Sequence, residues 1–157
     1  MRPLEKDAFW MTWVKDELQA GRHVKLTAHG WSMFPTLYRG VQLEISKVPL
    51  AELQVGQLVA HARNGKAILH RLIAIQEQNG HWTLQTQGDS STQPDPLFDQ
   101  SAYLGKVLSI NGNSKHKALL PTFQVKHRRN ELLKDALLFL ATPYRVSRRL
   151  LNSLKVQ

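Results

Sequence analysis

The strongest constraint on the fold is a series of short segments between residues 24 and 110 in which apolar and polar side chains alternate. Such alternation puts one face of a segment into a core and the other toward solvent, which is typical of β-strands. The expected strands cover residues 24–29, 41–46, 57–63, 67–75, 81–87 and 104–110. We therefore expect a mainly β domain.

Two Asn-Gly pairs, Asn64-Gly65 and Asn79-Gly80, separate consecutive expected strands. Asn and Gly tolerate the positive φ angles that two-residue hairpin turns require, so the pairs predict two tight antiparallel hairpins. Six short strands at this spacing favour a twisted antiparallel sheet or partial barrel over an α/β fold.

Both ends of the chain have helical periodicity instead. From Leu4 to Leu18 apolar residues recur at three- and four-residue steps and Gly21 follows, which predicts an N-terminal amphipathic helix within residues 1–21. We expect this helix to cap the sheet, although its tryptophans would also suit a membrane interface. The β domain then covers residues 22–110, and leucine stripes broken by Pro143 predict a helical tail over residues 111–157.

The net charge of +9 is concentrated in that tail. Residues 1–110 carry 11 Lys and Arg against 10 Asp and Glu, whereas residues 111–157 carry 10 against 2. An anionic membrane, nucleic acid or an acidic protein would each suit such a tail. Nucleic acid is the least favoured partner, because no helix-turn-helix precedes the sheet and Tyr144 is the one aromatic residue after Phe139 available for base stacking.

The composition excludes several other classes of protein. With no cysteine the chain has no disulfide, thiol nucleophile or thiolate zinc site. The longest apolar run, Ala136–Ala141, is far shorter than the ~20 residues of a membrane span, and the N-terminus does not resemble a secretory signal. We expect a cytoplasmic protein without a transmembrane segment, whose basic tail can contact the inner face of the membrane peripherally.

A serine in the turn between the first two expected strands is the sharpest chemical feature. Gly30-Trp31-Ser32-Met33-Phe34-Pro35 puts Ser32 on a rim loop, where Gly30 permits close approach of a substrate backbone and Pro35 stiffens the loop. A hydroxyl held in a fixed direction has little entropy left to lose on reaction. Ser32 is therefore a candidate nucleophile.

A serine nucleophile needs a base, and a histidine base is oriented by a carboxylate. His70 shares a strand face with Ile68, which would desolvate its ring and keep it neutral. His61 on the neighbouring strand is its one serious rival as base. Asp89 and Asp95 are the candidate carboxylates, and sequence spacing does not rank them. The histidines show no His-x-His or His-Glu-x-x-His spacing, so we expect no metal and no cofactor.

Three segments together resemble the type I signal peptidases and the related LexA-like serine peptidases. Residues 32–37, Ser-Met-Phe-Pro-Thr-Leu, resemble the nucleophile box of these families, and residues 67–73 resemble the strand that carries the general base. His70 stands where the endoplasmic-reticulum and sporulation-type signal peptidases have histidine and the leader peptidases have lysine. Residues 88–95 resemble the Gly-Asp element of the same Ser-His branch. The resemblance covers about residues 22–110.

This resemblance implies a LexA/signal-peptidase-like fold and a serine endopeptidase that forms an acyl-enzyme at Ser32 with His70 as general base. Asp95 is favoured as the residue that orients His70, and Asp89 as one that shapes the loop. The substrate would be a peptide or protein precursor with small residues before the cut, which suits a specialised maturation protease. Some leader peptidases have a hydroxyl side chain where this chain has Gly30, which leaves the Ser32 backbone N–H as the main oxyanion donor. The alternative is a catalytically silent binding module with the same fold, whose basic tail docks nucleic acid, anionic membrane or an acidic partner.

Overall fold

The structure is a computed structural model that describes residues 3–116 and 119, all within one compact unit spanning residues 1–123. One helix, α1 (Pro3–Gln19), precedes seven strands and a short 3-10 helix, η1 (Leu50–Glu52). The strands are β1 (Val24–Thr27), β2 (Gln42–Ser46), β3 (Leu58–Arg63), β4 (Lys66–Gln78), β5 (His81–Gln87), β6 (Phe98–Asp99) and β7 (Tyr103–Ile110). Residues 120–157, which make up most of the predicted helical tail and carry most of its charge, lie outside the described residues.

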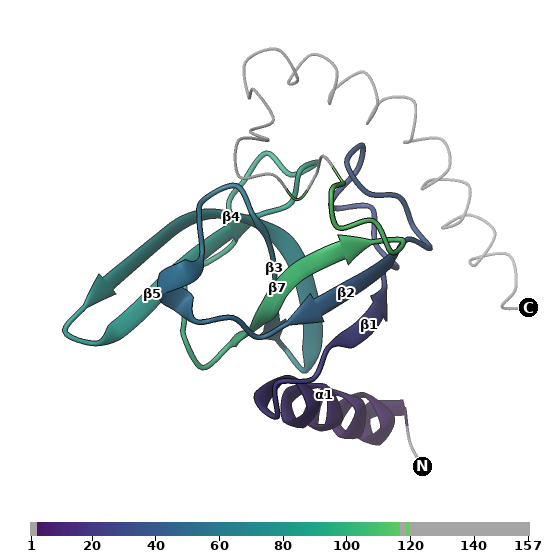
Figure 1. The fold of residues 1–157 in the computed structure, drawn as a ribbon, viewed down its shortest axis with the longest axis horizontal. Helices are drawn as coiled ribbons and strands as arrows, with labels where there is room; N and C mark the ends of the chain where they lie inside the picture. The colour runs from purple at the N-terminus through teal and green to yellow at the C-terminus, as the bar shows by residue number, and fades with distance from the viewer. Residues whose placement is uncertain (1–2, 117–118, 120–157) are drawn as a thin grey trace, which may run out of the picture. The chain divides into compact units, whose positions relative to one another are not determined.

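The strands form one antiparallel sheet in the order β1-β2-β7-β3-β4-β5-β6, which curls into a half-barrel (Figure 1). The predicted mainly β class is confirmed, and each of the six expected strands is present. The seventh, β6, was missed because two residues are too few to show alternation.

Both predicted hairpin turns are confirmed. Asn64 and Gly65 have φ angles of 51° and 70°, and Asn79 and Gly80 have 52° and 79°, as a two-residue turn of this type requires. The first turn sets Arg63 opposite Lys66 and the second sets Gln78 opposite His81. Pairing in the second hairpin shifts between Leu72 and Ala74, where β4 carries one extra residue.

The N-terminal helix packs on the sheet through one narrow face. Met11, Val14 and Leu18 are buried in the main core cluster, and Gly21 ends the helix with a φ of 75°. The capping role predicted for this helix is confirmed, and Figure 1 shows α1 beside β1. The aromatic side chains on the predicted apolar face are not buried in the core: Phe9, Trp10 and Trp13 are 67%, 41% and 46% exposed. Met11, on the same helix, takes a core position instead.

Two clusters of buried side chains lie on the two faces of the curled sheet. The larger contains the buried α1 residues and others from loops and strands, among them Met33, Leu37, Leu43, Ile45, Leu58 and Val107. The smaller contains Leu53, Val59, Leu72, Leu84 and Tyr103. Within the described residues, no helix is long and apolar enough to span a membrane.

Candidate active site

Ser32 lies at the surface, on the loop that joins β1 to β2. Hydrogen bonds between Ala28 and Val41, and from the Gly40 N–H to the Ala28 carbonyl, close the neck of this loop at 2.9 and 2.7 Å. Met33 is buried beside Ser32 and anchors the loop in the larger core cluster. A surface hydroxyl next to a buried anchor is held in place without being covered.

His70 lies on β4, opposite Val59 of β3. Its Nδ1 is 2.5 Å from Oδ2 of Asp95, and the two side chains are only 12% and 14% exposed. A carboxylate only accepts hydrogen bonds, so Nδ1 carries the proton in the neutral ring. The other ring nitrogen, Nε2, is therefore the one with a free lone pair.

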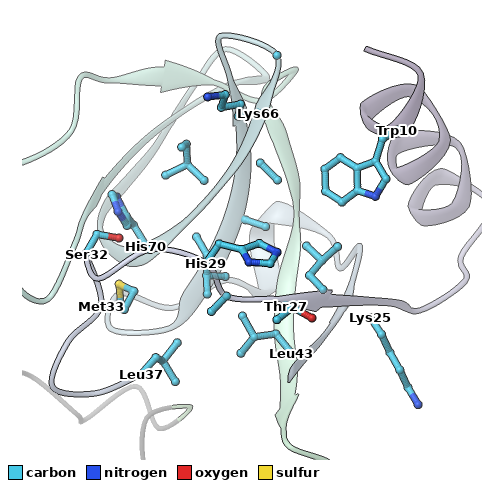
Figure 2. A pocket seen from close by; sticks show the side chains of 18 residues that line it. Trp10, Lys25, Thr27, His29, Ser32, Met33, Leu37, Leu43, Lys66 and His70 are labelled. Carbon is cyan, nitrogen blue, oxygen red and sulfur yellow. The ribbon is translucent and has the colours of Figure 1, made fainter. Parts of the chain in front are cut away.

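Gly88 is the point at which the nucleophile loop and the base meet. A Cβ added at Gly88 would lie 3.1 Å from Cβ of Ser32 and 3.2 Å from Nε2 of His70, so both atoms lie close to the same point beside the Gly88 backbone. Figure 2 shows the two side chains together at one end of a pocket. Among the residues described, no hydrogen bond joins the Ser32 hydroxyl to the His70 ring.

The two candidate aspartates take different partners on β4. Asp95 pairs with His70, whereas Asp89 forms a two-pronged ion pair with the next residue, Arg71, at 2.8 and 2.7 Å. Adjacent strand residues point to opposite faces of a sheet, so the loop between β5 and β6 reaches both sides of β4. Arg71 also donates to the Gly56 carbonyl at 2.6 Å, and the Arg71–Asp89 pair is almost fully buried.

The Asp95 carboxylate has further donors. The Thr86 hydroxyl donates to the same Oδ2 at 2.8 Å, and Nη1 of Arg63 approaches Oδ1 at 3.4 Å. Behind Thr86 lies His61, with its Nε2 3.2 Å from the Thr86 hydroxyl oxygen. Burial lowers the pKa of His61 from its ordinary 6.5 to about 4, so the ring is neutral near pH 7.

His61, His70 and Asp95 are also the one group in the described chain whose donor atoms could surround a metal ion, since these atoms lie within 4.8 Å of one another. Three atoms of this group are already engaged in hydrogen bonds, however. His70 Nδ1 is bonded to Asp95, and the Thr86 hydroxyl lies between Asp95 and His61. A histidine that ligates through Nε2 also normally donates its Nδ1–H to an acceptor, and among the described residues Nδ1 of His61 has none. A hydrogen-bond network accounts for the cluster better than a metal site does.

A pocket of about 640 Å³ extends from Ser32 and His70 toward α1, where Trp10 forms its far wall (Figure 2). Its sides are residues 25–30, in and after β1, and residues 65–70, at the start of β4. β1 is an edge strand, and β4 pairs with β5 only from Arg71 onward. Within the described chain, both sides of the pocket thus carry strand edges without a neighbouring strand.

The backbone N–H of Ser32 has no hydrogen-bond acceptor in the part of the chain that the structure describes. Next to it, a methyl group added at Gly30 would lie 3.9 Å from both the N and the Oγ of Ser32, so there is room for a side chain at that position. Ser32 lines the pocket, and its backbone N–H is available to donate to a negative oxygen formed beside it.

Sequence reasoning named Ser32, His70, Asp95 and Asp89 but did not foresee the partners Arg71 and Thr86, and it treated His61 only as a rival base. One signal was available. The two-residue turn at Asn64-Gly65 sets the pairing of β3 with β4, which puts His61 opposite Ile68 and therefore on the face of His70. No comparable signal places Thr86 or Arg71. No family model matches the chain, and no curated protein matches it either.

Proposed function

We propose that this protein is a serine endopeptidase of the signal-peptidase-like superfamily, with a LexA/signal-peptidase-like fold. Ser32 is the nucleophile, His70 the general base and Asp95 the group that orients His70. The observation that carries the proposal is that Ser32 Cβ and His70 Nε2 lie close to the same point beside the Gly88 backbone, while Nδ1 of His70 is hydrogen-bonded to Asp95. The mainly β half-barrel is compatible with it.

The chemistry follows from the hydrogen-bond directions. Asp95 holds the proton on Nδ1, so Nε2 can accept the proton of the Ser32 hydroxyl once that hydroxyl rotates toward the ring. The Ser32 oxygen then attacks a peptide carbonyl, and Asp95 stabilises the imidazolium that results. The free Ser32 N–H donates to the oxyanion. Protonated Nε2 next gives its proton to the leaving amine, and water repeats the cycle on the acyl-enzyme.

The pocket suggests how the substrate binds. An extended peptide can pair with the edge of β1 on one side and with Lys66–His70 on the other, and so complete the sheet where the half-barrel is open. The backbone hydrogen bonds would carry affinity, and the pocket floor would select side chains. Met33 and Leu37 on that floor are buried and apolar, which suits a small apolar residue before the cut.

The test uses the full chain and its Ser32→Ala variant. Each is incubated with a complex mixture of peptides, and new termini are mapped by mass spectrometry, while a fluorophosphonate probe reports on the nucleophile. We expect cuts and probe labelling with the wild type only, and a labelled peptide containing Ser32. If equal cutting occurs with Ser32→Ala, the proposal fails. If neither protein cuts or reacts, the catalytically silent binding module is favoured.

His70→Ala and His61→Ala separate the two candidate bases. Replacement of the true base abolishes turnover and leaves the melting temperature of the fold nearly unchanged. We expect this of His70→Ala. If His61→Ala abolished turnover and His70→Ala did not, the assignment of the base would be wrong.

A further inference from the structure

The proposed mechanism does not use His61, although this side chain is buried and held by specific contacts. It lies on β3, is 2% exposed and stacks on the Phe98 ring, with centroids 4.2 Å apart and planes 14° apart. A buried histidine without a charge partner is costly unless it stays neutral, and burial keeps it so by lowering its pKa to about 4.

The direction of each hydrogen bond in this cluster can be worked out. The Thr86 hydroxyl has one proton, which it donates to Oδ2 of Asp95 at 2.8 Å. Its oxygen is therefore the acceptor in the 3.2 Å contact with Nε2 of His61, and His61 carries its proton on Nε2. Nδ1 of His61 is then the unprotonated nitrogen, and no hydrogen-bond donor reaches it among the described residues.

These bonds act on the Asp95 carboxylate and not on its backbone. The Asp95 N–H donates to the Thr86 carbonyl at 2.8 Å and the Asp95 carbonyl accepts from the Gln85 side chain at 3.1 Å, so the main chain is held without His61. The carboxylate, in contrast, can rotate unless its oxygens are fixed. Thr86 fixes the same oxygen that accepts from His70, and His61 fixes the Thr86 hydroxyl.

We propose that His61 is a positioning residue that acts through Thr86: its Nε2–H orients the Thr86 hydroxyl, which orients the Asp95 carboxylate toward Nδ1 of His70. His61 donates a hydrogen bond to Thr86, and Thr86 donates one to Asp95. Asp95 also accepts a hydrogen bond from the His70 N–H. This inference rests on the proposed peptidase function for its catalytic consequence, but not for its geometry.

The test compares variants that remove one bond and keep the shape. Thr86→Val removes the hydroxyl at nearly equal volume, Thr86→Ser keeps it, and His61→Phe keeps a flat ring against Phe98 without the N–H. His81→Phe, at an exposed position on β5, is the matched control. We expect Thr86→Val and His61→Phe each to lower kcat by roughly 10- to 100-fold with KM within about twofold, well short of the ~10⁴-fold cost of losing a triad carboxylate.

A double-variant cycle and a rescue distinguish positioning from a merely structural role. Because His61 and Thr86 act in one series of hydrogen bonds, the double variant should lose no more kcat than the more impaired single variant. Thr86→Ser and His81→Phe should stay near the wild type. Wild-type kcat in His61→Phe, or losses that multiply in the double variant, would overturn the proposal.

Nitrogen-15 NMR of the imidazole rings tests the geometry without any substrate. We expect His61 as the Nε2–H tautomer, and a His70 Nδ1–H resonance that moves in Thr86→Val and in His61→Phe but not in Thr86→Ser. A His61 ring protonated on Nδ1 at neutral pH would refute the proposed hydrogen bond from His61 Nε2 to Thr86. If the rings behave as expected and the protein cuts nothing, the peptidase assignment fails while the positioning geometry stands.

Discussion

The backbone N–H of Ser90 donates a hydrogen bond of 2.9 Å to the carbonyl oxygen of Ser32. The Ser90 hydroxyl adds a second bond, to the Trp31 carbonyl at 3.0 Å. The loop that follows β5 is thus fastened to the nucleophile loop, although nearly sixty residues separate the two in the sequence. Since the same loop supplies both aspartates, the position of Ser32 and that of the carboxylates are set together.

A substitution at Gly88 tests how closely the loop after β5 has to approach the loop that carries Ser32. A Cβ at this position would lie 2.7 Å from the Ser32 carbonyl oxygen, which is too close for any real contact with backbone, so Gly88→Ala must displace the loop. A displacement of about 1 Å at a reacting group can cost ~100-fold in rate. We expect at least that loss of kcat, measured on a peptide substrate. Gly30→Ala is the matched control, because its Cβ would meet nothing closer than 3.9 Å. Equal losses of kcat in both variants would contradict this account of Gly88.

We expect Asp95→Asn to lower the catalytic rate and Asp89→Asn to lower the stability of the fold. Asp95→Asn removes the acceptor of the His70 N–H, so kcat should fall by roughly 10⁴-fold with little change in melting temperature. Asp89→Asn leaves the buried Arg71 guanidinium without its counter-charge, which costs about 3–5 kcal/mol of the free energy of unfolding. Urea unfolding and steady-state kinetics measure the two effects. The reverse pattern would exchange the roles of the two aspartates.

Gly30→Ser should supply a second oxyanion donor. The position has room for a side chain beside the free Ser32 N–H, and a hydroxyl there can donate to the same oxyanion. Loss of one such donor costs ~10²–10³-fold in known enzymes, and we expect an added, less rigid donor to raise kcat by about threefold to tenfold. The comparison is with Gly30→Ala, and identical kcat values for the two variants would argue against an oxyanion site at this N–H.

Stability should fall with acidification because of His61. Its pKa is about 4 in the folded chain, mainly through burial, with Asp95, His70 and Arg63 as the titratable groups nearby, and 6.5 is its ordinary value. Between these values the unfolded chain binds a proton that the folded chain does not, so the free energy of unfolding decreases as pH falls from 6.5 to 4. The loss is at most about 3 kcal/mol.

Urea titrations between pH 7 and 4 measure this loss. His61→Phe should show a flatter dependence than the wild type, whereas His81→Phe, at an exposed position, should follow the wild type. Parallel curves for the wild type and His61→Phe would mean that His61 is not buried as the structure describes.

Chelation should leave activity intact. Nδ1 of His70, Oδ2 of Asp95 and Nε2 of His61 are each engaged in a hydrogen bond, so we expect neither turnover nor the melting temperature to change after dialysis against EDTA. Inactivation by EDTA that zinc reverses would show that this cluster holds a metal, and would require a different mechanism.

The amino-acid sequence alone determined the local structure of this protein. Alternating apolar residues specify the strands, because a strand buries every second side chain, and the Asn-Gly pairs specify hairpins, because few other residues accept positive φ. Together they were sufficient to place His61 and His70 on one face of the first hairpin. They also put Ser32 on a rim loop, since it follows one strand and precedes the next.

Only the tertiary structure decided which groups meet. An uninterrupted second hairpin would set Thr86 opposite Ile73, on the face away from His70, but the extra residue between Leu72 and Ala74 sets it opposite Leu72 and turns it toward Asp95. The choice between Asp89 and Asp95 likewise depended on Arg71, whose burial demanded a carboxylate. Curling of the sheet, bulges and loop closure depend on contacts between distant residues, and no local pattern of side chains encodes those contacts.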